Sequence, residues 1–225
     1  MIVNVNGIDL FYEKTGTGRP LMMVHGNGED HSIFDEAVEI LKDRFTCYCV
    51  DSRGHGQSSP VNEYHYTDMA RDMLAFMKQL NLRNAAFYGY SDGGIVALLA
   101  ASKTRRITSL VTSGANLTPQ GVKLSLWLSM RLQNLIHPHP LTQLMIREPH
   151  ISKNLLRRIQ AKTLVLAGEN DLIREKETRR IARGIPGAEM RILPGEDHGS
   201  YIAHSPKIGK ILLEYLDEGH TAFIN

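Results

Sequence analysis

The chain has 225 residues, of which 42% are hydrophobic and 22% charged, a mixture typical of globular proteins. This composition excludes a disordered chain, a collagen-like repeat and a disulfide-stapled miniprotein. Its 26 Lys+Arg and 24 Asp+Glu residues leave a formal net charge of +2, too small to indicate a nucleic-acid partner. At roughly 150 residues per domain, the length favours one domain with an insertion.

The longest uninterrupted apolar run, residues 95–101, is far shorter than the roughly 18–20 residues that a membrane-spanning helix needs. The first residues have neither the basic stretch nor the apolar segment of a secretory signal, so we expect none. The only two cysteines, Cys47 and Cys49, are two residues apart and poorly placed for a disulfide. Free thiols are typical of a reducing compartment, so we expect a cytoplasmic protein.

Predicted strands and helices alternate along most of the chain, beginning with a hairpin. Asn6-Gly7, a dipeptide that favours tight turns, separates strands at residues 2–6 and 8–14. The alternation is typical of a mostly parallel sheet, here of eight strands, flanked by helices on both faces. Short apolar runs predict the other strands at residues 21–24, 45–50, 85–88, 107–111, 163–167 and 190–193. Helical spacing of apolar residues predicts helices at residues 33–41, 67–80, 93–102, 175–183 and 205–218.

Residues 116–161 interrupt this alternation because they contain no predicted strand. They begin with a helical stretch that is apolar on nearly all sides, and such a helix must be buried or must cover something. We therefore expect residues 1–115 and 162–225 to form an α/β core, with residues 116–161 inserted as a small helical lid. The apolar residues of the stretch are Leu124, Leu126, Trp127, Leu128, Met130 and Leu132.

The segment Gly89-Tyr90-Ser91-Asp92-Gly93 lies between a predicted strand and a predicted helix. This is the G-x-S-x-G pattern in the strand–turn–helix context of a nucleophile elbow. The serine must take a strained backbone conformation so that its hydroxyl projects from the turn, and the flanking glycines let strand and helix approach closely. We therefore expect Ser91 to be a nucleophile.

A serine hydroxyl is a poor nucleophile until a base takes its proton. The chain has ten histidines, and His198 is the one that directly follows the last predicted strand. This position lies at the carboxyl edge of the sheet, where open α/β sheets build their sites. We expect His198 to be the base.

The base needs a carboxylate that sets its tautomer and stabilises the imidazolium. Asp171 follows the predicted strand at residues 163–167 in the same topological position, and Glu169 is a weaker candidate two residues earlier. Asp92 and Asp197 are excluded because they adjoin the nucleophile and the base, and the loop after the preceding strand contains no carboxylate. Asp171 is therefore the expected acid, which gives the chain order Ser, Asp, His.

Negative charge that develops on the attacked carbonyl oxygen requires two preorganised N–H donors. The backbone amide of Asp92 is one candidate, because it follows the nucleophile and begins a helix whose dipole favours negative charge. The backbone amide of Asn27 is the other, since the loop His25-Gly26-Asn27-Gly28 follows the predicted strand at residues 21–24.

These motifs together resemble the α/β-hydrolase fold superfamily over essentially the whole chain. His25-Gly26, the loop at residues 51–58, the elbow and the loops after the last two strands match its landmarks in order. The resemblance implies that residues 51–56 form a structural turn near the site. It implies the following roles: nucleophile for Ser91, base for His198, acid for Asp171, and oxyanion donors for Asn27 and Asp92.

The lid helix would supply part of a substrate pocket, with Trp127, Leu128 and Met130 as candidate wall residues. The lid is shorter than in many members of the superfamily. The acyl pocket would therefore be either open or completed by a second subunit, which makes a homodimer one arrangement of the protein.

Two further patterns suggest other chemistry but lack the necessary context. His137 and His139 alternate with prolines and have no Cys or carboxylate cluster nearby, so we expect no zinc site. The glycines around Ser91 lie in the middle of the chain rather than in a first βαβ unit, which disfavours a dinucleotide site. We expect neither a metal nor a cofactor.

The sequence thus predicts a cofactor-independent serine hydrolase that cleaves a small ester or related acyl compound through an acyl-enzyme. The same three residues could also serve a thioesterase, a C–C bond hydrolase or a perhydrolase. A non-catalytic ligand receptor on the same fold is an alternative from a different class. Specificity depends on loop and lid geometry, so the substrate is not named by these motifs.

Overall fold

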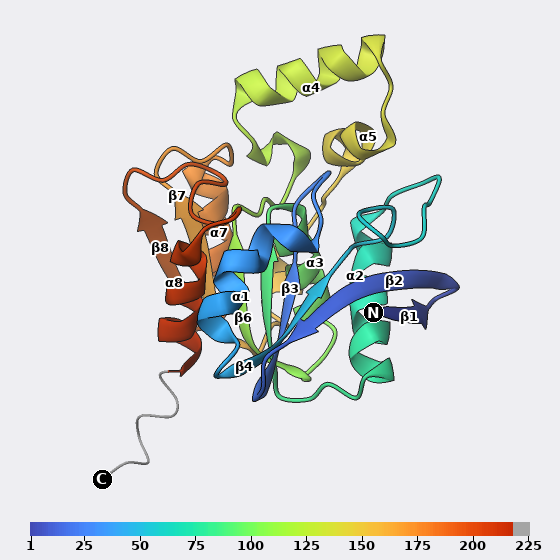
Figure 1. Cartoon of the computed structure of the whole chain (residues 1–225). Helices are drawn as coiled ribbons and strands as arrows, with labels where there is room; N and C mark the ends of the chain where they lie inside the picture. The colour runs from blue at the N-terminus through green and yellow to red at the C-terminus, as the bar shows by residue number, and fades with distance from the viewer. Residues whose placement is uncertain (218–225) are drawn as a thin grey trace.

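The computed structural model describes residues 1–217, in which eight strands form a single sheet of order β1-β2-β4-β3-β5-β6-β7-β8 (Figure 1). The first hairpin pairs antiparallel and joins the sheet antiparallel to β4, and the remaining strands are parallel. The expected mostly parallel eight-stranded sheet is confirmed. The strands are β1 (Ile2–Val5), β2 (Ile8–Thr15), β3 (Arg19–Val24), β4 (Phe45–Val50), β5 (Ala85–Tyr90), β6 (Ile107–Ser113), β7 (Lys162–Gly168) and β8 (Glu189–Leu193).

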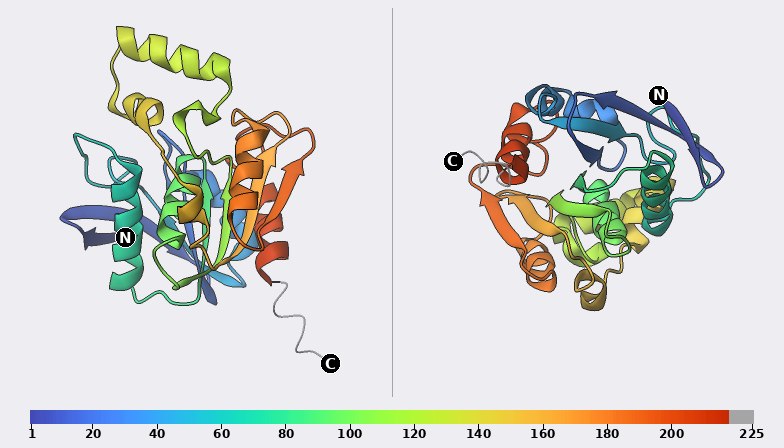
Figure 2. Two further views of the ribbon diagram at one scale, coloured as in Figure 1. Left: turned by 180° about the vertical axis from the view of Figure 1, so that it is seen from behind. Right: turned by 90° about the horizontal axis from the view of Figure 1, so that it is seen from below.

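Helices cover both faces of the sheet, as Figure 2 shows from behind and from below. One buried cluster joins α1 and α8 to the sheet, and a second, larger cluster joins α2, α3 and α7 to it. The predicted end of the last helix at residue 218 lies outside the described residues. These helices are α1 (Asp35–Leu41), α2 (Tyr66–Gln79), α3 (Asp92–Ala101), α7 (Glu175–Gly184) and α8 (Pro206–Asp217).

The turn that contains Ser91 lies between a buried strand and a buried helix at the centre of the sheet. All residues of β5 and of α3 are buried, and apart from Asp92 at its start the helix has no polar face. Because β5 lies between β3 and β6, its carboxyl end opens at the middle of the sheet edge. A residue between β5 and α3 is therefore fixed on both sides by the core.

Residues 116–161 lie above the carboxyl edge of the sheet, with α4 (Leu124–Ile136) outermost and α5 (Pro140–Arg147) beneath it (Figure 1). The short helices η2 (Pro119–Gly121) and α6 (Lys153–Leu156) complete the segment, and η1 (His31–Phe34) precedes α1. No helix among residues 1–217 is both long and apolar enough to cross a lipid bilayer.

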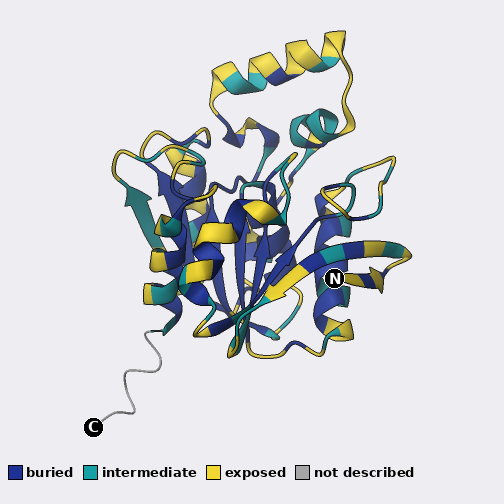
Figure 3. Ribbon diagram, in the orientation of Figure 1, coloured by how far each residue is buried: buried dark blue, intermediate teal, exposed yellow. Residues whose placement is uncertain are grey.

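Of the two alternatives given for the apolar stretch, burial or covering another part of the protein, the structure excludes burial of the whole helix. Only Met130 of this helix is buried, since α4 packs on α5 and η2 through one face (Figure 3). Within residues 1–217, no element packs on its outer face. The large apolar side chains exposed there are Leu124, Leu128, Leu132, Leu135 and Ile136.

Candidate active site

Ser91 occupies the turn between β5 and α3 in a conformation that L-residues rarely adopt, with φ 52° and ψ −115°. Glycines on both sides allow it. A Cβ at Gly89 would lie 2.8 Å from the Cα of Gly94, and one at Gly93 would lie 2.6 Å from the carbonyl oxygen of His25. The strand, the helix and the loop after β3 thus approach too closely for any other residue, and the turn projects the Ser91 side chain.

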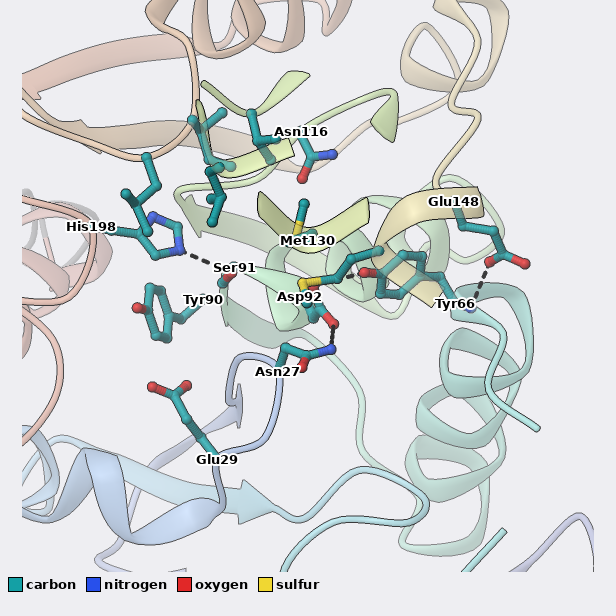
Figure 4. Close-up of a pocket in the computed structure, with 15 residues that line it drawn as sticks. Asn27, Glu29, Tyr66, Tyr90, Ser91, Asp92, Asn116, Met130, Glu148 and His198 are labelled. Carbon is teal, nitrogen blue, oxygen red and sulfur yellow. Dashed lines mark hydrogen bonds between the residues drawn. The ribbon is translucent and has the colours of Figure 1, made fainter. Parts of the chain in front are cut away.

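Ser91, His198 and Asp171 form a continuous hydrogen-bonded chain at the carboxyl edge of the sheet. His198 Nε2 lies 3.0 Å from Ser91 Oγ (Figure 4). On the other side of the ring, His198 Nδ1 lies 2.7 Å from Asp171 Oδ1. With the proton on Nδ1, the ring donates to the carboxylate and its Nε2 accepts from the serine hydroxyl. The loops that follow β5, β7 and β8 supply one member each, so the structure brings together the three residues selected from the sequence.

Asp171 is buried and is oriented by its own loop. Its carboxylate accepts from the backbone amides of Ile173, at 2.8 Å, and Gly168, at 3.3 Å. The rival Glu169 instead accepts from the Gly195 amide at 2.8 Å on the protein surface. Glu169 therefore ties two loops together, while Asp171 faces the imidazole.

His198 is held in place by its neighbours as well as by Asp171. The ring of Tyr90 tilts against the imidazole with 5.2 Å between ring centroids. Asp197, excluded above, accepts from the backbone amides of Gly199 and Ser200, which lowers the pKa of this carboxyl. That interaction shapes the loop and leaves the Nδ1 side of the imidazole to Asp171.

The loop after β3 carries Asn27 to the same place. Burial lowers the pKa of His25 to about 4, so this imidazole is neutral. It donates from Nδ1 to the carbonyl of Gly26 at 2.7 Å and accepts at Nε2 from the backbone amide of Ser52 at 3.0 Å. The turn that begins at Asp51 therefore holds the loop, while Glu29 Oε2 accepts from the Gly26 amide at 2.9 Å.

The two residues expected to supply the oxyanion donors are hydrogen-bonded to each other through their side chains. Asn27 and Asp92 both line the cavity in front of Ser91, and the amide of Asp92 is among the first N–H groups of α3, which lack a helical acceptor. The carboxylate of Asp92 accepts from Asn27 Nδ2 at 2.8 Å and from the hydroxyl of Tyr66 at 2.7 Å (Figure 4). Burial raises the pKa of Asp92, and these two hydrogen bonds oppose that rise.

The cavity that Ser91 faces has a volume of about 270 Å³ and a mostly apolar wall, part of which comes from residues 116–161. Of the three wall residues expected from the sequence, Met130 lines it, whereas Trp127 and Leu128 do not belong to the lining. Leu126 takes their place, because it lies one turn before Met130 on the same face of α4. Trp127 packs in a small cluster beside the cavity, and the side chain of Arg131 lies over its ring.

Several cavity residues escaped the sequence analysis, among them Glu29, Tyr66 and Glu148. Glu29 is partly buried, and this burial raises its pKa. Tyr66 begins α2, and its backbone amide donates to Glu148, which follows α5. Glu29 could have been noticed, since it lies four residues after His25 in the loop already singled out. Tyr66 and Glu148 carry no local signal, because only the fold brings them to the cavity.

A cluster with ligand atoms suited to a cation lies outside the cavity and consists of Asp30, His31 and Asp51. Each acid has another role here. Asp51 accepts from the backbone amides of His31 and Gln57, and Asp30 accepts from that of Ser32 as the cap of η1. These hydrogen bonds explain why the three residues lie close together, so the cluster is a structural one.

The amino-acid sequence is similar to those of known proteins. A family model described as the alpha/beta hydrolase fold matches residues 19–139. The chain is 27% identical to serine hydrolase BPHL of Homo sapiens, over 95% of this chain and 85% of the human protein. It is 26% identical to the AB hydrolase superfamily protein YisY of Bacillus subtilis, over 92% and 95% of the two chains.

Solved structures show the same fold at lower identity. The enol-lactonase of Burkholderia xenovorans LB400 superposes with a TM-score of 0.84 at 20% identity, covering 97% of this chain and all of the other. A thermophilic esterase from Thermogutta terrifontis superposes with a TM-score of 0.78 at 24% identity, covering 97% of both chains. The likeness extends over the sheet, its flanking helices and the segment above them.

Proposed function

The chain belongs to the alpha/beta hydrolase fold family, and we propose that it is a cofactor-independent serine hydrolase that cleaves a small ester or related acyl compound. One observation carries this proposal: the hydrogen-bonded chain Ser91–His198–Asp171 ends at a strained serine that faces an apolar cavity. Its relatives are hydrolases, which supports the general activity.

In the proposed reaction, Ser91 Oγ attacks the carbonyl carbon while His198 Nε2 takes the hydroxyl proton. Asp171 stabilises the resulting imidazolium, and the backbone amides of Asn27 and Asp92 bind the oxyanion. When the tetrahedral intermediate collapses, the imidazolium gives its proton to the departing alcohol and an acyl-enzyme remains. In the second half, the same imidazole takes a proton from water as the water oxygen attacks the acyl-enzyme. The imidazolium then gives that proton to Ser91 Oγ when the bond between Ser91 and the acyl group breaks and the acid is released.

Residues 116–161 act as the lid over this site, and residues 1–115 with 162–225 form the catalytic core, of which residues 218–225 lie outside the described part. Leu126 and Met130 form the lid's contribution to the acyl pocket. A cavity of about 270 Å³ holds a short acyl group, which supports a small substrate. Because the wall is apolar, burial of the acyl chain supplies binding energy of ~0.8 kcal/mol per CH₂ until the pocket is full.

The protein further forms a homodimer through the outer face of α4. Leu124, Leu128, Leu132 and Leu135 form an exposed stripe with helical spacing. Arg131, the charged residue of α4, has its side chain over the ring of Trp127. A two-fold contact between two such stripes would bury apolar surface without opposing like charges. Sedimentation of the wild type should give a dimer, and Leu128→Ser with Leu132→Ser a monomer; a monomeric wild type would refute this assembly.

The proposed location is the cytoplasm. Cys47 and Cys49 are both free and buried in the sheet, and burial raises the pKa of the Cys47 thiol to about 12. Two inert, unpaired thiols are compatible with a reducing compartment.

A fluorophosphonate probe tests the proposal directly, because it reacts with a serine that a base has activated. We expect labelling of the wild type and none of Ser91→Ala, whereas Ser129→Ala, which changes an exposed serine of α4, should label as the wild type does. Labelling that persists in Ser91→Ala would refute the assignment.

A panel of p-nitrophenyl esters and matched thioesters then separates the alternatives that share these three residues. Preference for thioesters would indicate a thioesterase. Cleavage of an added β-diketone would indicate a C–C bond hydrolase, and formation of a peracid when hydrogen peroxide is added to the ester would indicate a perhydrolase. A folded wild type that binds an acyl ligand but turns over none of these compounds would instead indicate a receptor.

A further inference from the structure

The side chain of Asp92 has no part in the reaction described above, which uses only the backbone amide of this residue. Yet the carboxylate is buried beside the nucleophile, where an isolated negative charge would be costly. Each of its two oxygens accepts a hydrogen bond from a different segment of the chain. Oδ2 accepts from Asn27 Nδ2 at 2.8 Å, and Oδ1 accepts from the Tyr66 hydroxyl at 2.7 Å.

Asn27 is a residue whose position needs such a support. It precedes Gly28, which has φ +73° and open space where a Cβ would lie, so packing at Gly28 does not fix the backbone of Asn27. The hydrogen bond to Asp92 ties the Asn27 side chain directly to the residue that follows Ser91. It therefore joins the two residues whose backbone amides must point at one oxygen atom.

Tyr66 in turn is fixed by the inserted segment. Its ring is buried at the start of α2, and its backbone amide donates to Glu148 Oε2 at 3.1 Å. Figure 4 shows Glu148, Tyr66, Asp92 and Asn27 along one side of the cavity. The Asn27 loop is thus linked through Asp92 and Tyr66 to the end of α5.

We infer that Asp92 is a positioning residue for the oxyanion hole. Its carboxylate holds the Asn27 loop so that the backbone amides of Asn27 and Asp92 point at the same oxygen atom, and the Tyr66 hydroxyl holds the carboxylate. This inference rests on the proposed serine hydrolase function. It assigns to Asp92 a role through hydrogen-bond geometry rather than through contact of its charge with the substrate.

Substitutions can separate a hydrogen-bonding role of the Asp92 carboxylate from a role in which its charge contacts the substrate. In Asp92→Asn the new carbonyl oxygen can still accept from Asn27, and the new amide can donate to the Tyr66 hydroxyl, which accepts as readily as it donates. Asp92→Ala loses both bonds. Asn27→Asp sets two carboxylates against each other, but Asn27→Asp combined with Asp92→Asn restores one donor facing one acceptor and keeps the net charge.

The experiment measures kcat and KM for a p-nitrophenyl ester, and the affinity for a trifluoromethyl ketone that forms a tetrahedral adduct with Ser91. Loss of a complete oxyanion donor costs on the order of 10²–10³ in kcat, so misplacing one should cost roughly 10- to 100-fold. We expect this loss in Asp92→Ala and in Asn27→Asp, with a parallel loss of ketone affinity and a smaller change in KM. Asp92→Asn and the double variant should recover most of both losses.

A second hydrogen bond between an Asn and an Asp side chain, away from the site, provides a control. Asn6 Nδ2 donates to Asp72 at 2.9 Å, away from the cavity, so Asn6→Asp creates the same kind of repulsion elsewhere. It should lower the melting temperature without changing kcat. If Asp92→Ala does not fold, Tyr66→Phe, which removes a single hydroxyl, provides the graded variant and should lower kcat and ketone affinity together.

The inference is overturned if Asp92→Asn is as damaging as Asp92→Ala and acts mainly on KM, since the charge would then contact the substrate. It is also overturned if the folded double variant recovers nothing over Asn27→Asp, or if folded Tyr66→Phe keeps full activity. Failure of the proposed function gives a different result, namely a wild type that neither reacts with the probe nor turns over esters.

Discussion

Gly114 lies directly against the imidazole of His198. A Cβ at this glycine would come within 2.6 Å of His198 Cε1 and 2.8 Å of Nδ1, distances shorter than real contacts of this type. Gly114 follows β6 and has φ +61°, and its amide donates to the carbonyl of Leu166 at 3.1 Å, so its backbone is held by the next strand. The absence of a side chain there leaves the space in which the imidazole reaches both Asp171 and Ser91.

Gly114→Ala should therefore reduce activity by displacing the base. A displacement of about 1 Å can cost 10²-fold in rate, so we expect kcat/KM to fall by at least that order. Gly187→Ala is the control, because Gly187 also has a positive φ, +70°, but has open space where a Cβ would lie. Both variants should lose roughly 1–2 kcal/mol of stability from the left-handed conformation, and only Gly114→Ala should lose activity. Equal activity in the two variants would show that the contact with His198 is unimportant.

Asp171→Asn should cost on the order of 10⁴ in kcat, because an amide favours the wrong tautomer of the histidine to which it is bonded. Glu169→Gln should have a small effect, since Glu169 only accepts from the Gly195 amide at the surface. Steady-state kinetics on one ester compares the two. A crippled Glu169→Gln beside a nearly normal Asp171→Asn would reverse the assignment of the acid.

The lid should set the acyl chain length through Leu126 and Met130. Met130→Ala enlarges the cavity and should move the optimum of a graded p-nitrophenyl ester series toward longer chains, each additional buried CH₂ gaining ~0.8 kcal/mol. Leu128→Ala is the control on the same helix, because Leu128 is exposed outside the cavity lining. Trp127→Ala should lower stability rather than change chain preference, since Trp127 packs beside the cavity. An unaltered preference in folded Met130→Ala would place the acyl group elsewhere.

His25 should make folding sensitive to acid. Burial lowers its pKa in the folded state to about 4, below the value of roughly 6.5 expected when the chain unfolds. Between these two values the unfolded state binds more protons, so stability contributed by the neutral ring is present above pH 6.5 and is lost as the pH falls toward 4. The loss should approach about 3 kcal/mol across this interval.

Denaturant unfolding of wild type and His25→Gln from pH 7 to pH 4 isolates this effect, because the other titrating groups are common to both. The difference in unfolding free energy between the two proteins should shrink as the pH falls. A constant difference over the whole range would mean that the ring titrates equally in the folded and unfolded states.

Much of the fold and of the site's composition follows from the sequence alone. Short apolar runs predict the strands, and helical spacing of apolar residues predicts the helices. The carboxyl ends of parallel strands lie at the same edge of a sheet. Residues that directly follow those strands must therefore meet, which is why Ser91, Asp171 and His198 could be selected before any contact was known. The elbow pattern around Ser91 is local and needs no tertiary information.

Tertiary structure alone decided which side chains surround the reacting atoms. A helix that is apolar on nearly all sides has no periodicity that indicates its inner face. The sequence therefore did not distinguish the cavity-lining Leu126 from Trp127 and Leu128. For the same reason it did not predict that the leucines on the outer face of α4 would be exposed. The Asn27–Asp92 and Tyr66–Asp92 contacts join residues 65 and 26 positions apart. Such contacts depend on how β3, α2 and α3 pack in three dimensions, and no local pattern of residues records that packing.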